Sequence, residues 1–284
     1  MTTIAGLKQQ KIWRNAAVMN FTFGSAAAGS YIFTALHFYL SADSLGQVQM
    51  LANTFVAIAL MGMGFGLLAL ETGASWKARY SVLNIRTSWM SREVVAGGIF
   101  LFFSAAGIIF PVWWIIGIAA LAAFAFIVTQ AMIIYRSRAI VTWNTPPVIW
   151  LFVLSGVMSG FGVFILLMGP AHSEVAKVPA IALALVGYGS FWWYYAFLYN
   201  AGDSSFRAAT VHLRRKRSIG VILGVGVIFP VGALLLVESS STLSADRILI
   251  VAAGAGIIYG VFQRNRDLII GAGYMRKMTM GRPG

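Results

Sequence analysis

The chain has 284 residues, of which 59% are apolar and only 10% are charged, and its mean hydropathy is +0.81. Soluble domains carry about 25% charged residues, so this composition excludes most soluble folds and is typical of a protein surrounded by lipid. Lys and Arg number 21 against 8 Asp and Glu, a formal net charge of +13, and there is no cysteine. The lack of cysteine excludes disulfides, cysteine-ligated zinc and an iron–sulfur cluster held by this chain alone.

Eight apolar segments are long enough to cross a bilayer, which needs about 20 residues in a helix. They comprise residues 15–40, 46–70, 93–110, 112–135, 146–168, 176–200, 218–237 and 246–262. We therefore predict an all-α, polytopic membrane protein: one integral membrane domain over residues 1–284, built as a bundle of eight transmembrane helices.

The distribution of positive charge predicts the orientation of these helices. The N-terminus, the connections 71–92, 136–145 and 201–217, and the tail from Gln263 together carry 19 of the 21 Lys and Arg residues. The other side has only Lys177 and Arg247. Because Lys and Arg gather in cytoplasmic loops, both termini are expected in the cytoplasm, and the protein in the inner (cytoplasmic) membrane. The positive charge on the cytoplasmic side would then set the topology, bind anionic lipid, or form a surface on which partners dock. No nucleic-acid partner is expected.

The residues inside the spans restrict the function. A retinal Schiff base needs a lysine within a helix, and the four lysines before residue 200 lie at helix ends or in loops. Of the three histidines only His37 lies in a span, so no haem is expected. All eight acids fall at predicted helix ends or in loops, whereas transporters usually carry charge near the midplane. A stand-alone transporter or exporter of a small neutral molecule stays an alternative.

Uncharged residues in the spans predict helix packing. Asn53, Thr54 and Gln130 are the main polar side chains of the second and fourth spans, and are expected to hydrogen-bond between helices. Pairs of glycines four residues apart allow helices to approach closely. These pairs are Gly62–Gly66, Gly156–Gly160 and Gly256–Gly260.

The connection between the second and third spans mixes cations, aromatic residues and a carboxylate. Its members are Glu71, Trp76, Lys77, Arg79, Tyr80, Arg86, Trp89, Arg92 and Glu93. An interfacial aromatic belt with Lys and Arg at the membrane edge is one interpretation, and Ser88 or Ser91 is expected to cap the third helix. Glu71 fits that interpretation badly, since a carboxylate at a helix C-terminus faces an unfavourable dipole. It needs an arginine partner or a functional role.

The segment 62–93 resembles the corresponding segment of dimethyl-sulfoxide-reductase-type membrane anchor subunits. The shared features are Gly62, Gly64 and Phe65, then Glu71, Gly73, Trp76 and Lys77, and the run Ser-Trp-Met-Ser-Arg-Glu over residues 88–93. Trp143 before Pro146-Pro147, and Arg266-Asp267-Leu268-Ile269 with Ala272 and Tyr274, are similar to two further segments. Such subunits are haem-free, eight-helix, quinone-handling anchors of molybdopterin oxidoreductases, and their relatives serve sulfite dehydrogenases and phenylacetyl-CoA:acceptor oxidoreductases in anaerobic or lithotrophic respiration.

The resemblance implies a quinone site, for ubiquinone or menaquinone, at the membrane edge. Some relatives carry a quinol-linked histidine where this chain has Glu71, so Glu71 is the candidate for proton exchange with quinone. The residues expected to bind the quinone ring and its carbonyl groups are Trp76, Arg79, Tyr80, Trp89, Arg92 and Arg136. Pairing of Glu71 with an arginine is the structural alternative.

The resemblance also implies partners, because the chain holds no redox centre and is not expected to be catalytic alone. An iron–sulfur, ferredoxin-like subunit and a molybdopterin catalytic subunit are expected on the cytoplasmic face. The residues expected to dock them are Lys77, Arg86, Arg214, Arg215 and Arg217. The protein would then pass electrons between the iron–sulfur subunit and the quinone pool, with quinone reduction the expected direction and the sulfite- and acyl-CoA-oxidising relatives the nearest type.

Overall fold

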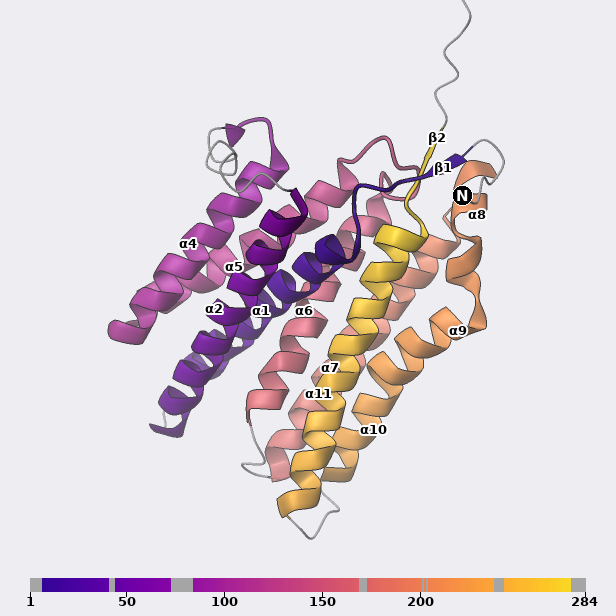
Figure 1. Ribbon diagram of the computed structural model, residues 1–284. Coiled ribbons are helices and arrows are strands. Elements are labelled where there is room, and N and C mark those ends of the chain that lie inside the picture. Colours follow the sequence, from indigo (N-terminus) through magenta and orange to yellow (C-terminus); the bar gives the residue numbers. More distant parts are fainter. Residues whose placement is uncertain are drawn as a thin grey trace, which may run out of the picture.

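The fold is a bundle of long helices (Figure 1), and the computed structural model describes residues 7–40, 44–72, 84–168, 173–200, 202, 204–237 and 243–276. The uninterrupted long helices are α1 (Asn15–Leu40), α2 (Ser44–Thr72), α4 (Trp89–Ile109), α5 (Trp113–Tyr135), α6 (Pro146–Met168) and α7 (Ser173–Leu198). After α8 (Ser204–Ala209) and the 3-10 turn η2 (Val211–Arg214), one continuous helix combines α9 (Lys216–Ile219), the π-helical η3 (Gly220–Ile228) and α10 (Phe229–Leu236). The last helix is α11 (Leu243–Arg266), which the π-helical η5 (Asp267–Gly271) extends.

Local sequence accounts for several helix boundaries. The Ser88 side chain accepts a hydrogen bond from the Ser91 backbone N–H at 3.3 Å and so caps α4, as predicted for Ser88. Helix α6 begins at Pro146, a position where the missing N–H and fixed φ of proline favour a helix start. Pro230 removes one N–H from the penultimate long helix, and the wider turns of η3 lie directly before it.

Seven helices of the described chain are long and apolar enough to cross a membrane, which makes the protein an all-α polytopic membrane protein. They are α2, α4, α5, α6, α7, the α9–η3–α10 helix, and α11 with η5. Helix α1 is the exception because small and hydroxyl residues cover its buried surface, among them Thr22, Ser25 and Ser30. It packs against α2, α5, α6 and α11, so neighbouring helices rather than lipid cover much of it.

The apolar core of the described residues has three large parts. The first lies towards the end of the bundle where both described chain ends lie and contains Phe21, Trp143, Phe152 and Tyr194. The other two meet along α1 and α6. One part contains Tyr31, Met61, Phe100 and Phe126, from α1, α2, α4 and α5. The other contains Phe161, Leu183, Leu234 and Ile257, from α6, α7, α10 and α11. This arrangement leaves the α1–α6 interface as the seam between two groups of helices.

Glycines allow the closest helix contacts. A Cβ atom on Gly160 would lie 2.2 Å from the carbonyl carbon of Gly29, so α1 and α6 approach at backbone distance, as the Gly156–Gly160 spacing predicted. Gly260 of α11 likewise meets Gly226 of η3, because a Cβ atom on Gly260 would lie 2.5 Å from the Gly226 Cα. The same prediction is wrong for Gly62 and Gly66, since no other described element has an atom within 4 Å of such a Cβ.

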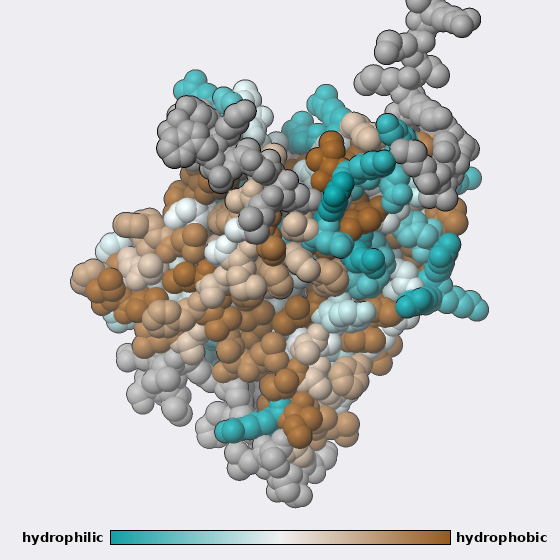
Figure 2. Space-filling model, in the orientation of Figure 1, coloured by the Kyte–Doolittle hydropathy of each residue, from teal (hydrophilic) through white to brown (hydrophobic). Residues whose placement is uncertain are grey.

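Both described ends of the chain lie at the same end of the bundle. Strand β1 (Leu7–Gln9) pairs antiparallel with β2 (Tyr274–Arg276), with Leu7 opposite Arg276 and Gln9 opposite Tyr274. Leu7 and Tyr274 pack with Ala209 of α8, and Figure 1 shows the two strands beside that helix. Figure 2 shows that hydrophilic residues gather at this end, whereas apolar residues cover most of the visible side of the helices.

Two predicted boundaries place charged residues differently from the structure. The segment from Gln263 is not a tail loop, because α11 continues to Arg266 and the apolar span extends over Ala245–Gly271. Helix α4 begins at Trp89, and Glu93 therefore lies within its second turn rather than at its start. Arg264 and Glu93 both become buried residues of the bundle, with exposed fractions of 1% and 2%.

Candidate functional site

The predicted quinone loop falls largely outside the described residues. Trp76, Lys77, Arg79 and Tyr80 all lie in the segment 73–83, which the structure does not describe. Glu71 is part of the last turn of α2, but its side chain also lies outside the described part of the chain. The proton-exchange role assigned to Glu71 and the quinone-binding roles of its neighbours therefore stay predictions.

The structure brings together three of the remaining predicted residues at the start of α4. The Arg92 guanidinium lies over the Trp89 ring, 4.1 Å from its centroid. It also donates from Nε to the Ile85 carbonyl and from Nη2 to the Arg86 carbonyl, each at 2.9 Å. Arg92 thus fixes the segment that leads into α4, and the Arg86 side chain is exposed beside it.

Directly after Arg92, Glu93 points into the bundle and joins a buried polar cluster. Its Oε1 accepts a hydrogen bond from Gln130 Nε2 of α5 at 3.0 Å, and Asn20 of α1 also hydrogen-bonds to the carboxyl group. Each of these three side chains is only 2% exposed. Among the described residues no cation pairs with Glu93, so neutral amide groups alone hold a buried carboxyl group one turn below the helix start.

Glycines make room for this Glu93–Gln130–Asn20 cluster. A Cβ atom on Gly64 of α2 would lie 3.1 Å from Asn20 Oδ1, and one on Gly24 of α1 would lie 3.2 Å from Gln130 Nε2. Asn20 Oδ1 is buried and has no hydrogen-bond partner within the described part of the chain. The cluster therefore contains a carboxyl group, which is able to hold or release a proton, and an acceptor without a partner among the described residues.

The polar side chains singled out in the spans behave differently from one another. Gln130 joins α5 to α4, as predicted, through Glu93. Thr54 instead bonds within its own helix, donating to the Met50 carbonyl at 2.7 Å, so the prediction of an interhelical bond is wrong for it. Neither side-chain polar atom of Asn53 has a partner in the described ranges, although both are buried.

The other predicted cations lie on the surface, at the end of the bundle that carries β1 and β2. Arg136 follows the last turn of α5 and is exposed. Arg214 donates to the Leu198 carbonyl at 2.7 Å and lies 5.6 Å from the Tyr199 ring centroid. Arg215 and Arg217 are exposed at the start of α9. They form a basic surface next to the chain ends, and its docking role stays a prediction.

Between these cations, His212 of η2 is partly buried against the end of α11. Its Nε2 is buried without a hydrogen-bond partner among the described groups. A Cβ atom on Gly271 would lie 2.2 Å from that Nε2, so only a glycine fits beside the imidazole. Burial lowers the pKa of His212, against an opposing effect of the Asp267 carboxylate.

A second buried polar group, centred on Arg264, was missed because the sequence assigned this residue to a loop. Its guanidinium donates to the Ser190 and Ser155 hydroxyl groups and, at 3.2 Å, to the Leu151 carbonyl. Ser155 donates in turn to Asn265 Oδ1 at 2.9 Å. The apolar residues 268–272 beyond Arg264 were the available signal that the helix continues past it.

Buried carboxyl and guanidinium groups, apolar helices and a basic end together define an integral, polytopic membrane protein with polar sites inside its bundle. Residues 10–259 match the family model described as DMSO reductase anchor subunit (DmsC). The protein belongs to this family, which confirms the resemblance to such anchors at the level of the family.

Two curated relatives match shorter regions. The C subunit of the anaerobic dimethyl sulfoxide reductase of Haemophilus influenzae is 30% identical over 119 residues, covering 37% of this chain and 41% of the relative. The YnfH subunit of an anaerobic dimethyl sulfoxide reductase of Escherichia coli is 24% identical over 163 residues, covering 52% of this chain and 55% of the relative. The protein thus matches about half, or less, of the length of each.

Proposed function

We propose that this protein is the membrane anchor and quinone-reactive subunit of a molybdoenzyme, passing electrons between an iron–sulfur partner and the quinone pool. Family membership supports the anchor role, and the buried Glu93 carboxyl group beneath the membrane-edge residues Trp89 and Arg92 carries the quinone role. Electrons are proposed to flow towards quinone, and a sulfite- or phenylacetyl-CoA-oxidising complex is the proposed type.

The proposed topology has eight membrane spans, with α1 as the eighth, and both termini in the cytoplasm. The pairing of β1 with β2 supports an even number of spans, because it requires both ends of the chain on one side. Arg264 lies inside α11 and no longer counts as a loop residue. Of the remaining Lys and Arg residues, 18 lie on the side of the chain ends and two, Lys177 and Arg247, on the other side. This bias supports a cytoplasmic location for the end that carries the strands, in the inner membrane.

The Glu93–Gln130–Asn20 cluster has the chemistry that proton exchange with a quinone requires. When bound, a quinone takes up two electrons and two protons as it is reduced. Glu93 can hold and deliver a proton at a fixed position, since Gln130 and Asn20 orient its carboxyl group. The free Asn20 Oδ1 offers an acceptor for a hydroxyl group in the same place. The residues therefore fit the group.

Trp89 and Arg92 are proposed to shape the entrance to this cluster. Arg92 uses Nε and Nη2 to hold the segment before α4, and it lies over Trp89. Its role is then to position the Trp89 ring and the first turn of α4, above Glu93. Glu71 stays a second candidate for proton exchange at the same membrane edge.

The basic surface is proposed to dock the partners. Arg214, Arg215 and Arg217 lie at one end of the bundle beside the paired strands, and three exposed cations favour a partner with an acidic surface. Lys77 and Arg86 are proposed to contribute from the connection before α4. An iron–sulfur subunit docked here would sit on the same side as the proposed quinone site.

Glu93→Gln, made in the assembled complex, tests the proposal. Quinone-coupled turnover is expected to fall at least about 100-fold, the usual worth of a positioned acid–base group, while turnover with an artificial dye survives. Asp246→Asn is the matched control, because Asp246 lies in the first turn of α11, at the opposite end of the bundle. Glu71→Gln, measured in parallel, tells which carboxyl group exchanges the proton.

Two results would contradict the proposal. Quinone turnover that is unchanged in both carboxamide variants would remove proton exchange from this membrane edge. Transport of a small molecule into liposomes that contain only this protein, with no iron–sulfur partner co-purifying, would favour the stand-alone transporter instead.

A further inference from the structure

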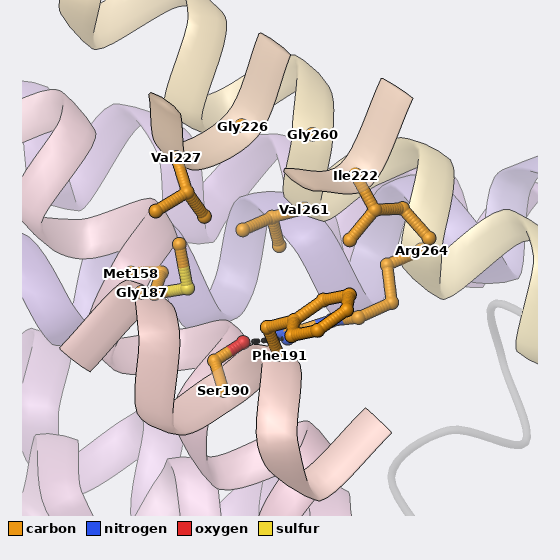
Figure 3. Close-up of a pocket in the computed structure, with 10 residues that line it drawn as sticks. All are labelled: Met158, Gly187, Ser190, Phe191, Ile222, Gly226, Val227, Gly260, Val261 and Arg264. Atoms are coloured by element: carbon orange, nitrogen blue, oxygen red, sulfur yellow. Dashed lines mark hydrogen bonds between the residues drawn. The ribbon is translucent and has the colours of Figure 1, made fainter. Parts of the chain in front are cut away.

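A small pocket lies beside Arg264, between α6, α7, η3 and α11 (Figure 3). Met158, Ser190, Phe191, Val227 and Val261 line it with Arg264, and three glycines and Ile222 complete the wall. Apart from Arg264 and Ser190, these residues carry no nitrogen or oxygen in their side chains. The pocket is therefore an apolar space with one positive charge and one hydroxyl group at its edge.

The positive charge of Arg264 has no negative partner in the described part of the chain. Its side chain is 1% exposed, and its three hydrogen bonds go to two serine hydroxyl groups and one backbone carbonyl. The titratable group that interacts with it is Tyr194, and a phenol is neutral at ordinary pH. Because an uncompensated buried charge is strongly unfavourable, a negatively charged ligand beside Arg264 would stabilise the site.

The free hydrogen-bonding groups at the pocket are donors. A guanidinium has five N–H groups, and three hydrogen bonds of Arg264 are formed, so two N–H groups are left over. One of them is Nε, which is buried without a partner among the described residues. Ser190 accepts from Arg264, and its own O–H has no acceptor in the same ranges. A ligand here must accept hydrogen bonds and need not donate any.

Size limits the ligand to one small species, and chemistry distinguishes between the candidates. The pocket volume is about 10 Å³, which limits a ligand to a single water molecule or one small ion and does not by itself distinguish between them. A water molecule could accept from these donors but would leave its own O–H groups facing an apolar wall and would not compensate the positive charge, whereas a halide ion only accepts and is negative. We propose that the pocket binds one small monovalent anion of halide size, such as chloride, which the Arg264 N–H groups and the Ser190 hydroxyl group hold.

Binding would neutralise a charge at the point where three helices meet. Arg264 comes from α11, Ser190 from α7, and Ser155 and Leu151 from α6, so the guanidinium already links all three. An anion at Arg264 would stabilise this linked state and not the unfolded protein. The stability of the protein should therefore depend on a halide and not on ionic strength in general.

The test is thermal unfolding of the purified full-length protein in detergent, in sodium gluconate and with stepwise replacement by sodium chloride or bromide at constant ionic strength. At a saturating halide concentration the unfolding temperature is expected to rise by about 5 °C. Arg264→Gln should abolish the halide dependence, and Ser190→Ala should weaken the apparent halide affinity at least about tenfold. Arg266→Gln, which changes an exposed arginine two positions further along α11, should keep the wild-type response.

A second measurement keeps the proposal testable if Arg264→Gln does not fold. Crystals of the wild-type protein grown in bromide are expected to show an anomalous scattering peak between Arg264 and Ser190. An unfolding temperature that stays the same when chloride or bromide replaces gluconate, or the absence of a bromide peak at this position, would overturn the proposal.

Discussion

Gly160→Ala tests the closest contact in the bundle, where α6 crosses α1. A Cβ atom on residue 160 would lie 2.2 Å from the carbonyl carbon and 2.3 Å from the Cα of Gly29. Ordinary van der Waals contact for such an atom begins at 3.4 Å, so the two backbones must separate by about 1 Å. No flexible side chain can give way here, because backbone faces backbone on both sides.

The expected cost follows from two opposing effects. Overpacking a tight interface lowers the free energy of unfolding by about 1–3 kcal/mol. The better helix propensity of alanine raises it by at most about 1 kcal/mol. The net loss of about 1–2 kcal/mol corresponds to an unfolding temperature lower by about 4 °C for a protein of this size. Thermal unfolding followed by tryptophan fluorescence in detergent measures it.

Gly62→Ala is the matched control, since residue 62 has the same glycine spacing but a Cβ atom there would meet no neighbouring helix within 4 Å in the described part of the chain. This variant gains the helix propensity without the clash, so its unfolding temperature should stay the same or rise. If Gly160→Ala were as stable as the wild type, α1 and α6 would not meet at backbone distance. The close packing described for the interface between the two groups of helices would then be contradicted.

Two further predictions concern the end of the bundle that carries the strands. Trp143 is 1% exposed and donates from Nε1 to the Leu268 carbonyl at 3.0 Å. Trp143→Phe removes this hydrogen bond and should lower the free energy of unfolding by about 1–3 kcal/mol, as measured by thermal unfolding. Trp192→Phe, at a position that is 64% exposed, is the control and should change the stability little. Burial lowers the pKa of His212 in the folded protein below the pKa of a histidine in the unfolded protein. The stability that the neutral imidazole supports is therefore complete above the unfolded-state pKa, and it is lost as the pH falls through the folded-state pKa. The unfolding temperature of the wild type should therefore fall more steeply between about pH 8 and pH 5 than that of His212→Gln, and parallel curves would contradict the buried, neutral imidazole.

The sequence by itself determined the class of the protein and most of its helices. Hydropathy identified apolar segments because a residue in lipid must be apolar whichever helix it faces, and this requirement acts on each segment separately. Capping by Ser88 and the helix start at Pro146 were likewise local, since the interacting groups lie within one turn. The resemblance to the anchor family came from short motifs read in the same way.

Only the tertiary structure decided which polar residues are functional candidates. Glu93 looked like a helix-end carboxylate, and its partners Gln130 and Asn20 come from helices that no local pattern could assign to it. Arg264 looked like a loop cation because a positive charge usually ends an apolar span, yet groups from α6 and α7 satisfy three of its donors inside the bundle. Gly62 and Gly160 have the same spacing in the sequence, but only Gly160 faces another helix. Polarity and spacing are properties of one segment, whereas burial and pairing depend on which segments meet.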